Sequence, residues 1–291
     1  MITITDKEIS EAIEKIPPLE PVVAKTLALI KDPTSSPQKL AQEIAKDVML
    51  TFEIMKIVNS PIYGFSRRVQ SLEHAITLLG FKSVESIVLS AYAKRVYDTD
   101  LKFFNLKRGE LSIQAFIGAF AAKLVAQENW PELEDLAFSA ATLRSVGKII
   151  MNFFFSKHYD KLSQELKKDF DSFDKLEKKI FGFTSNEFSI IILERWKIPN
   201  EIKEIVQFHN KLSLIKEKGS RLYKAAVSVH IGDRIAMMTG LGASIDSMKY
   251  PIDQEVFQYT KIKPQDIERY LEKTINIYPE IVREIIEVIP P

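Results

Sequence analysis

The chain has 291 residues, of which 46% are hydrophobic, enough for a sizeable core and too many for a disordered protein. Its 40 Lys and Arg residues against 39 Asp and Glu leave a net charge of +1, so composition gives no electrostatic reason to expect nucleic acid or an anionic membrane as a partner. Cysteine is absent, which excludes disulfides, thiolate metal ligands and a cysteine nucleophile.

The beginning of the chain gives no sign of a targeting segment. Residues 1–8 lack the basic start and apolar run of a signal peptide. No uninterrupted apolar segment approaches the ~20 residues that a membrane-spanning helix needs. We therefore expect a cytoplasmic protein without a membrane partner.

About five short helices with clear start and stop signals are predicted up to about Tyr97. Ser36 followed by Pro37 is typical of an N-cap and the first position of a helix. Asp47 is a second N-cap, and its helix should end before Pro61, because the residue preceding a proline is pushed away from helical geometry. These signals predict two helices, one after Ser36 and one after Asp47.

Two apolar runs with helical period follow, on either side of Gly80. Their apolar residues recur at i, i+3, i+4 and i+7, namely Leu72, Ala75, Ile76 and Leu79, then Val84, Ile87, Val88 and Ala91. Ser71 and Ser83 precede the runs and are suited to accept the N–H groups of a first helical turn. Gly80 is suited to a left-handed helix stop, so we expect two separate helices here.

Helical patterns also fill the rest of the chain. A long helix rich in small residues should surround Gly118 and permit close helix approach, and another should begin near Ser220 and be closed by Gly240. One or two amphipathic helices are expected from 263 to 288. Because no stretch alternates with period two, the fold class is all-α, and we expect a two-lobed helical bundle. The boundaries are 1–100 for an N-terminal lobe and 101–291 for a second lobe with C-terminal helices.

Several short motifs, in a fixed order, resemble one known family. The chain is similar to the HDOD domain family over roughly residues 10–240, and the family is related to HD-type metal phosphohydrolases. The motifs that carry the resemblance are Ile16-Pro17-Pro18-Leu19, Asp32-Pro33, Val58-Asn59-Ser60, Tyr63-Gly64, Ser71-Leu72-Glu73-His74-Ala75-Ile76, Gly147-Lys148, Glu194-Arg195-Trp196 and His230-Ile231-Gly232-Asp233-Arg234. The resemblance implies a helical signalling module without the metal centre of its relatives.

The positions of a catalytic HD site can be compared with this chain one by one. The resemblance places the first histidine of such a site at Gln114, its adjacent His-Asp pair at Arg144 and Ser145, and its last aspartate at Asp233. A guanidinium cannot ligate a metal, and one carboxylate cannot hold a transition metal against water. We therefore expect a degenerate site with no catalytic residue, no metal and no cofactor.

Two interpretations of the degenerate position remain open. Arg144 and Lys148 are one helical turn apart, and together with His209, Asp233 and Arg234 they would suit a nucleotide or another anionic ligand. Alternatively, Arg144 forms an ion pair with Asp233 in place of the lost metal, and His209 is a capping or core-edge residue. We favour the ion pair.

The polar turn at Asn59, Ser60 and Tyr63 also has two interpretations. It is a candidate partner surface. Alternatively, Asn59 and Ser60 cap neighbouring helices while Tyr63 packs on the core, and we favour this structural role.

The leading functional hypothesis is a non-catalytic signal-transduction module that acts through protein contacts. The resemblance suggests a response regulator, a histidine kinase or a cyclic-dinucleotide enzyme as the partner. A nucleotide or other anionic-ligand sensor and a divergent metal-dependent phosphohydrolase are the alternatives. Nucleic-acid binding is disfavoured by the balanced charge, and the sequence does not predict an oligomeric state.

Overall fold

The computed structural model describes residues 4–158, 172–241, 244–245 and 251–283, and throughout these residues the fold is all-α without a β-strand. Four short helices come first, α1 (Asp6–Glu14), α2 (Pro21–Lys31), α3 (Pro37–Ile44) and α4 (Val48–Val58). The next are α5 (Leu72–Tyr97), α6 (Glu110–Asn129), α7 (Glu134–Leu143), α8 (Gly147–Lys157) and α10 (Phe173–Phe181). The last are α11 (Ser185–Arg195), α12 (Asn200–Phe208), α13 (Arg221–Met238), α14 (Gln254–Tyr259) and α15 (Pro264–Ile281).

The predicted helix signals near the N-terminus are confirmed. The side chain of Ser36 accepts a hydrogen bond from the backbone N–H of Lys39 at the start of α3, and Asp47 accepts one from Leu50 at the start of α4. The helix that Asp47 begins ends at Val58, before Pro61 as expected. Asp47 is also held by the guanidinium of Arg95 on α5, so this cap joins two helices.

The two helices expected around Gly80 form one element, α5, with a kink. Gly80 adopts the expected positive φ of 77° and lies outside helical geometry, so two helical segments meet there as predicted, with the second starting directly after the kink. Ser71 caps the first part through the N–H of His74. The prediction that Ser83 caps the second part is wrong, because Ser83 lies inside the helix and donates a 2.6 Å hydrogen bond to the carboxylate of Asp135 on α7.

Helix α5 is long and apolar enough, by length and composition alone, to cross a membrane, which corrects the expectation that no segment would be. It has 26 residues, and an 18-residue segment within it has a mean hydropathy of 1.3. However, 56% of that segment is buried inside the protein, and Gly80 interrupts the helical geometry. These features are those of a core helix that packs on protein at both sides.

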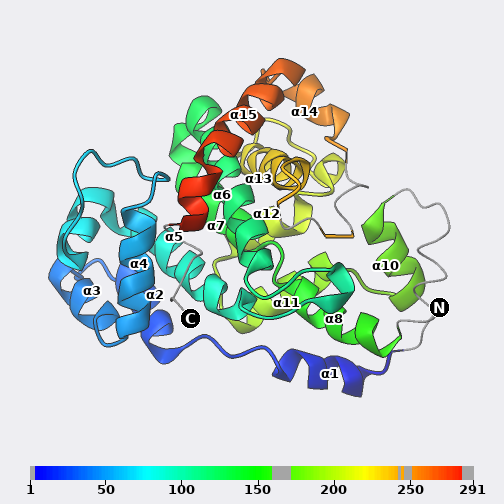
Figure 1. The fold of residues 1–291 in the computed structure, drawn as a ribbon, viewed down its shortest axis with the longest axis horizontal. Coiled ribbons are helices and arrows are strands. Elements are labelled where there is room, and N and C mark those ends of the chain that lie inside the picture. Colours follow the sequence, from blue (N-terminus) through cyan, green and yellow to red (C-terminus); the bar gives the residue numbers. More distant parts are fainter. Residues whose placement is uncertain (1–3, 159–171, 242–243, 246–250, 284–291) are drawn as a thin grey trace.

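The arrangement of the helices around α5 explains how distant segments are brought together. Helices α2, α3 and α4 gather at one end of the molecule against α5, whereas α6, α7 and α13 lie side by side in the larger part, with α15 across α6 (Figure 1). Helix α5 contacts α7 through buried hydroxyl groups, including the pairs Ser86–Ser139 at 2.7 Å and Ser90–Thr142 at 3.2 Å. These hydrogen bonds fix the register of α5 against the helix that leads to Arg144.

Candidate functional site

The four positions of the degenerate site converge at the crossing of α6 and α13. Gln114 lies on α6 and Asp233 on α13, while Arg144 and Ser145 follow the last turn of α7. The close approach of the two long helices depends on Gly232, since a Cβ atom there would collide with the backbone oxygen of Gly118. All four positions are therefore buried in one small region, with Arg144 only 4% exposed.

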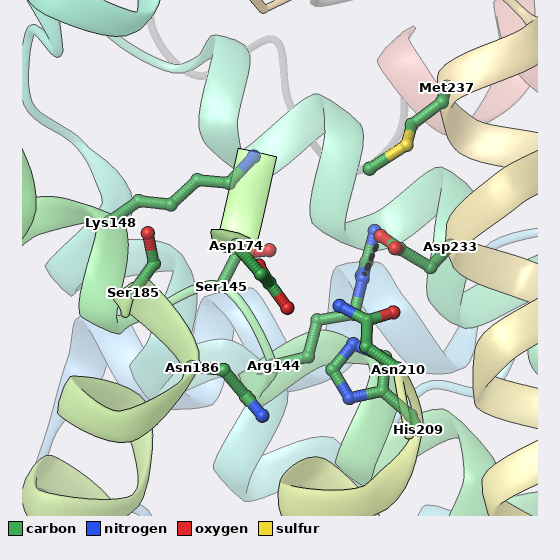
Figure 2. Close-up of a pocket in the computed structure, with 10 residues that line it drawn as sticks. All are labelled: Arg144, Ser145, Lys148, Asp174, Ser185, Asn186, His209, Asn210, Asp233 and Met237. Carbon is green, nitrogen blue, oxygen red and sulfur yellow. Dashed lines mark hydrogen bonds and ion pairs between the residues drawn. The ribbon is translucent and has the colours of Figure 1, made fainter. Parts of the chain in front are cut away.

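The guanidinium of Arg144 forms the ion pair with Asp233 that the sequence pattern favoured. Its Nε donates to Asp233 Oδ1 at 2.5 Å, and its Nη1 donates to the backbone oxygen of Ala141 at 2.5 Å. The guanidinium fits because Gly118 has no side chain, as a Cβ there would lie 2.6 Å from Arg144 Nη2. Figure 2 shows Arg144 and Asp233 directed toward each other.

The second oxygen of Asp233 is also occupied by a cation. Arg234 Nη1 donates to Asp233 Oδ2 at 2.5 Å, so the carboxylate lies between two guanidinium groups. Burial alone raises the pKa of Asp233, but attraction by Arg144 and Arg234 outweighs burial and holds that pKa well below its ordinary value. The carboxylate is therefore charged and has its main acceptor directions used by protein donors.

Arg234 and Lys148 are likewise engaged by neighbouring groups. Arg234 donates through Nη2 to Asn210 Oδ1 at 2.7 Å and through Nε to the backbone oxygen of Pro251 at 3.2 Å. Lys148 donates to Gln114 Oε1 at 3.2 Å. The candidate cations thus connect the parts of the site to one another.

Two buried histidines lie beside Asp233 and are held neutral. His209 Nδ1 is 2.7 Å from the backbone oxygen of Val206, and burial lowers the pKa of His209 to about 4. His230 Nδ1 is 2.8 Å from the backbone oxygen of His209, while its Nε2 accepts a 3.0 Å hydrogen bond from the N–H of Asp253. Because one ring nitrogen of His230 donates and the other accepts, its imidazole is neutral, and burial places its pKa well below the ordinary value.

A small cavity remains next to these groups. Its volume is about 40 Å³, and its lining includes Arg144, Ser145, Lys148, Asn186, His209 and Asp233 (Figure 2). Two polar atoms nearby have no hydrogen-bond partner in the described part of the chain, Gln114 Nε2 and Asn186 Oδ1. A cavity of this size has room for water-sized guests, whereas pockets for small organic ligands are roughly 300–1,000 Å³.

The residues at this position do not fit the divalent metal of a catalytic HD site. Across the described ranges, no three His, Cys, Asp or Glu side chains are grouped as metal ligands would be. A second carboxylate, that of Asp174, also lines the cavity (Figure 2). Asp233 is bound on both oxygens by guanidinium groups, and Arg144 places a positive charge at the position of the His-Asp pair. A cation in that position repels a metal ion, so the donor set disfavours one.

A model of the HDOD domain matches residues 16–212 of the chain, more than half of its length. The chain belongs to the HDOD family. It is also 22% identical over 221 residues to a Treponema pallidum (strain Nichols) protein, and the match covers 76% of this chain and 42% of that relative. The chain therefore spans less than half the length of that relative.

Solved structures of similar fold cover almost the whole chain. An HDOD domain protein with unknown function from Geobacter sulfurreducens is 19% identical with a TM-score of 0.72, and the match covers 96% of each chain. A Shewanella amazonensis SB2B protein, provisionally named a phosphohydrolase, is 17% identical with a TM-score of 0.67, covering 96% of this chain and 98% of that one. A provisionally named signal transduction protein from Marinobacter aquaeolei VT8 is 16% identical with a TM-score of 0.69, covering 96% of this chain and 64% of that one. At these identities the likeness establishes the HDOD fold.

The turn that was a candidate partner surface in this HDOD chain has clear structural roles. Asn59 receives the N–H of Val69 at 2.7 Å and donates to the backbone oxygens of Val69 and Met55. Ser60 is buried and donates to the backbone oxygen of Ile57 at 2.6 Å. The ring of Tyr63 lies 4.5 Å from the Nζ of Lys123 on α6. These contacts agree with the capping and packing roles that we favoured.

Several residues that shape the HDOD site were not identified from the sequence as parts of it. Gly118 was expected to allow helix approach, but it also makes room for the Arg144 guanidinium. Asn210 and Asn186 were missed because single amides carry no spacing signal. The proximity of Asn210 to His209 in sequence was the only available indication.

Proposed function

We propose that this HDOD chain is a non-catalytic regulatory module that acts in signal transduction through protein contacts. The observation that carries the proposal is the Asp233 carboxylate enclosed by the guanidinium groups of Arg144 and Arg234. Metal-dependent hydrolysis of a phosphoester needs a metal ion that activates water. The carboxylate that would help to hold this ion already has its charge compensated by two guanidinium groups. In this chain, the charged residues at that position bond one another and hold neighbouring helices together.

The size of the cavity argues against the nucleotide-sensor alternative at the same position. The space beside Arg144 and His209 is about 40 Å³, far below the volume of a nucleotide site. A nucleotide would also have to compete with Asp233 for the Arg144 guanidinium. We therefore place the signalling role of the module on its surface.

The contacts between the turn at Tyr63 and helices α5, α6 and α7 suggest how the binding of a partner at the surface would be transmitted. Lys123 is 6% exposed, contacts the ring of Tyr63, and forms ion pairs with Asp135 at 3.3 Å and Glu134 at 3.8 Å. Asp135 also accepts the hydrogen bond of Ser83 on α5. A partner that moved the Tyr63 turn would change the packing of α5 against α7, and its binding energy would favour one of two arrangements.

The proposed partner is a signalling protein of the cytoplasm, such as a response regulator, a histidine kinase or a cyclic-dinucleotide enzyme. The Marinobacter aquaeolei neighbour, named for signal transduction, is consistent with this context. Partners of this kind would supply the input that an HDOD module passes on.

Metal content and phosphodiesterase activity test the proposal together. Untagged protein purified without chelator should contain less than about a tenth of an equivalent of Mn, Fe, Ni or Zn, because the donor set disfavours a divalent ion. It should not hydrolyse bis(p-nitrophenyl) phosphate when these metals are added singly. The Asp233→Ala variant is the matched control for site-dependent binding.

Close to one equivalent of metal, lost together with hydrolysis in Asp233→Ala, would overturn the proposal in favour of a divergent phosphohydrolase. Thermal melting with a panel of nucleotides examines the sensor alternative. A rise in melting temperature with one nucleotide, absent in Arg144→Ala after allowance for that variant's own melting temperature, would favour the sensor. Unchanged melting across the panel agrees with the module acting through its surface.

A further inference from the structure

The outward face of α4 exposes large apolar side chains at helical spacing. Val48 is 77% exposed, and Met49 and Phe52 are each 50% exposed, whereas the opposite face of α4 is buried in the core. Phe65, from the loop after α4, adds a further exposed ring. These four are among only nine exposed large hydrophobic residues in the described ranges, and all four fall within residues 48–65. Such concentrated apolar exposure marks an interaction site more often than chance.

The apolar face borders a groove of about 660 Å³ between α4 and the loop that follows it. Its walls include Phe52, Met55, Asn59, Phe65, Arg68 and Val69. The loop wall is fixed in place, because the Asn59 side chain bonds both the N–H and the backbone oxygen of Val69. The groove is therefore preformed, and methionine and phenylalanine in its lining can adapt to apolar side chains of a guest.

The charge around this groove is of one sign. From Val48 to Gln70 the charged residues are Glu53, Lys56, Arg67 and Arg68. Glu53 is only 4% exposed, and its carboxylate forms an ion pair with the Nζ of Lys94 at 2.5 Å, so it contributes no surface charge. Arg67 and Arg68 are exposed, and Lys56 lies over the Phe52 ring at 5.6 Å. A nearly neutral protein thus presents a groove in which apolar side chains lie beside amide groups, and the charged residues that line it, Lys56 and Arg68, are both basic.

We infer that this groove, here called the α4 groove, binds an acidic amphipathic segment of a partner protein. Apolar side chains of the segment fill the space against Phe52 and Phe65, and its Asp or Glu residues meet Arg67 and Arg68 at the rim. The inference rests on the proposed function and specifies where the partner docks and what chemistry it has. It moves the partner surface from the Asn59 turn itself to the groove that the turn supports.

Charge and shape distinguish this occupant from others. A second copy of the chain docked through the same face would bring Arg67 and Arg68 against their own equivalents, and like charges would oppose a two-fold contact. An anionic membrane would suit the charge but would meet a concave wall, whereas a peptide fits into a groove. A protein segment with the opposite charge satisfies both features.

A peptide-display selection tests the inference with random peptides as the probe. Peptides of about 16 residues, long enough for four helical turns, are selected on the full-length protein. The selected peptides should be enriched in Asp and Glu and should carry apolar residues at i, i+3 or i+4, and i+7. Fluorescence anisotropy then measures the affinity of individual peptides for the protein and its variants.

The variants are chosen on the exposed surface so that folding is unaffected. Phe52→Asp should weaken binding about 10-fold or more, since it removes an aromatic ring that the bound peptide would bury. The double charge reversal Arg67→Glu with Arg68→Glu should weaken it by about 10-fold and reduce its salt dependence. Ile275→Asp on α15, where the side chain is also about half exposed at 48%, is the matched control and should bind as the wild type does.

Methionine methyl NMR reports the site directly. The signal of Met55, which lines the α4 groove, should shift on addition of peptide, as should that of Met49 on the exposed face of α4, whereas that of Met237, beside Arg144 and Asp233, should not. The inference is overturned if selection yields no acidic apolar peptides, or if those selected bind Phe52→Asp as tightly as the wild type. Binding to vesicles with about 30% phosphatidylserine that depends on Phe52, without peptide binding, would also overturn it in favour of a membrane surface.

The outcomes separate this inference from the proposed function. A failed selection combined with the absence of metal and of hydrolysis would reject the α4 groove alone. Site-dependent metal and hydrolysis would reject the non-catalytic function whatever the peptides do.

Discussion

The former metal position and the α4 groove treat charged residues in opposite ways. At the former metal position, Arg144, Arg234 and Asp233 are each at most 5% exposed, and they bond one another and the surrounding backbone. At the α4 groove, Arg68 lines the wall together with Phe52 and Phe65, and both Arg68 and its neighbour Arg67 are exposed. Buried charges that are compensated in this way hold a structure together, whereas exposed arginines around an apolar groove are available to a partner. The buried cluster around Asp233 and the exposed groove at α4 therefore differ in what their charges can bind.

The largest effect is expected from Arg144→Ala, which removes one of the two cations that compensate the buried Asp233. Removal of the guanidinium leaves a hole and leaves the buried Asp233 with one cation fewer, so the free energy of unfolding should fall by about 3–5 kcal/mol. Urea unfolding measures it. In a double-mutant cycle with Asp233→Asn, the double variant should lose less stability than the sum of the single variants. Additive losses would mean that the ion pair has no coupling energy.

A smaller loss is expected from Gly118→Ala, which adds one methyl group in contact with the Arg144 guanidinium. The new Cβ would lie 2.6 Å from Nη2, so the guanidinium must move away from its partners, at a cost of about 1–3 kcal/mol. Gly219→Ala is the matched control, because a Cβ there meets nothing within 4 Å. The same measurement should show a change within about 1 kcal/mol for Gly219→Ala. Equal effects of the two substitutions would contradict the tight fit around Arg144.

The buried histidines give a pH dependence of intermediate size. The pKa of His209 is lowered from 6.5 to about 4 in the folded state, so between these values the unfolded chain binds a proton that the folded chain does not. Stability is therefore fully present above about pH 6.5 and declines as pH falls toward 4, by up to about 1.4 kcal/mol per pH unit for one histidine. His230 is shifted in the same direction and should contribute similarly.

His209→Gln should reduce this slope, because it removes the buried imidazole. Denaturant titrations at several pH values from 7 down to about 4 measure the slope. An unchanged slope in His209→Gln would mean that the ring is not held neutral by burial.

The smallest effect on stability is expected at the α4 groove. Phe52 is half exposed, so Phe52→Asp loses only part of the burial of a core phenylalanine and should lower the free energy of unfolding by about 1 kcal/mol while it weakens peptide binding. Thermal melting and urea unfolding check the first part. A loss of several kcal/mol would show instead that the exposed face of α4 is needed for the stability of the fold.

Local sequence signals predicted the helices well where a single residue carries the information. Ser36, Asp47 and Ser71 cap helices as expected because a short side-chain oxygen can reach the backbone N–H two or three residues ahead without any help from the rest of the fold. Ser83 has the same local signal, but Asp135 lies close enough to bind its hydroxyl. The same type of residue therefore has a different role when a partner from 52 residues away in sequence is near.

The candidate site was predicted in its residues but not in its packing. Family order located Gln114, Arg144 and Asp233, and the structure brings them together. The second guanidinium on Asp233, the dependence on Gly118 and the small cavity were not predictable, since each depends on how α6, α7 and α13 cross. The α4 groove was missed because the exposed face of α4 has an apolar pattern that the sequence alone does not distinguish from a buried one.

Residue types and their local spacing were enough to predict the all-α class and several helix starts, and the family resemblance placed Arg144 and Ser145 where an HD site has its His-Asp pair. Which charges are compensated and which are exposed depends on how the helices pack. That outcome depends on distances between helices far apart in the chain, because the attraction between two charges falls as they move apart. The neutralised Asp233 and the basic rim of the α4 groove both arise at this level.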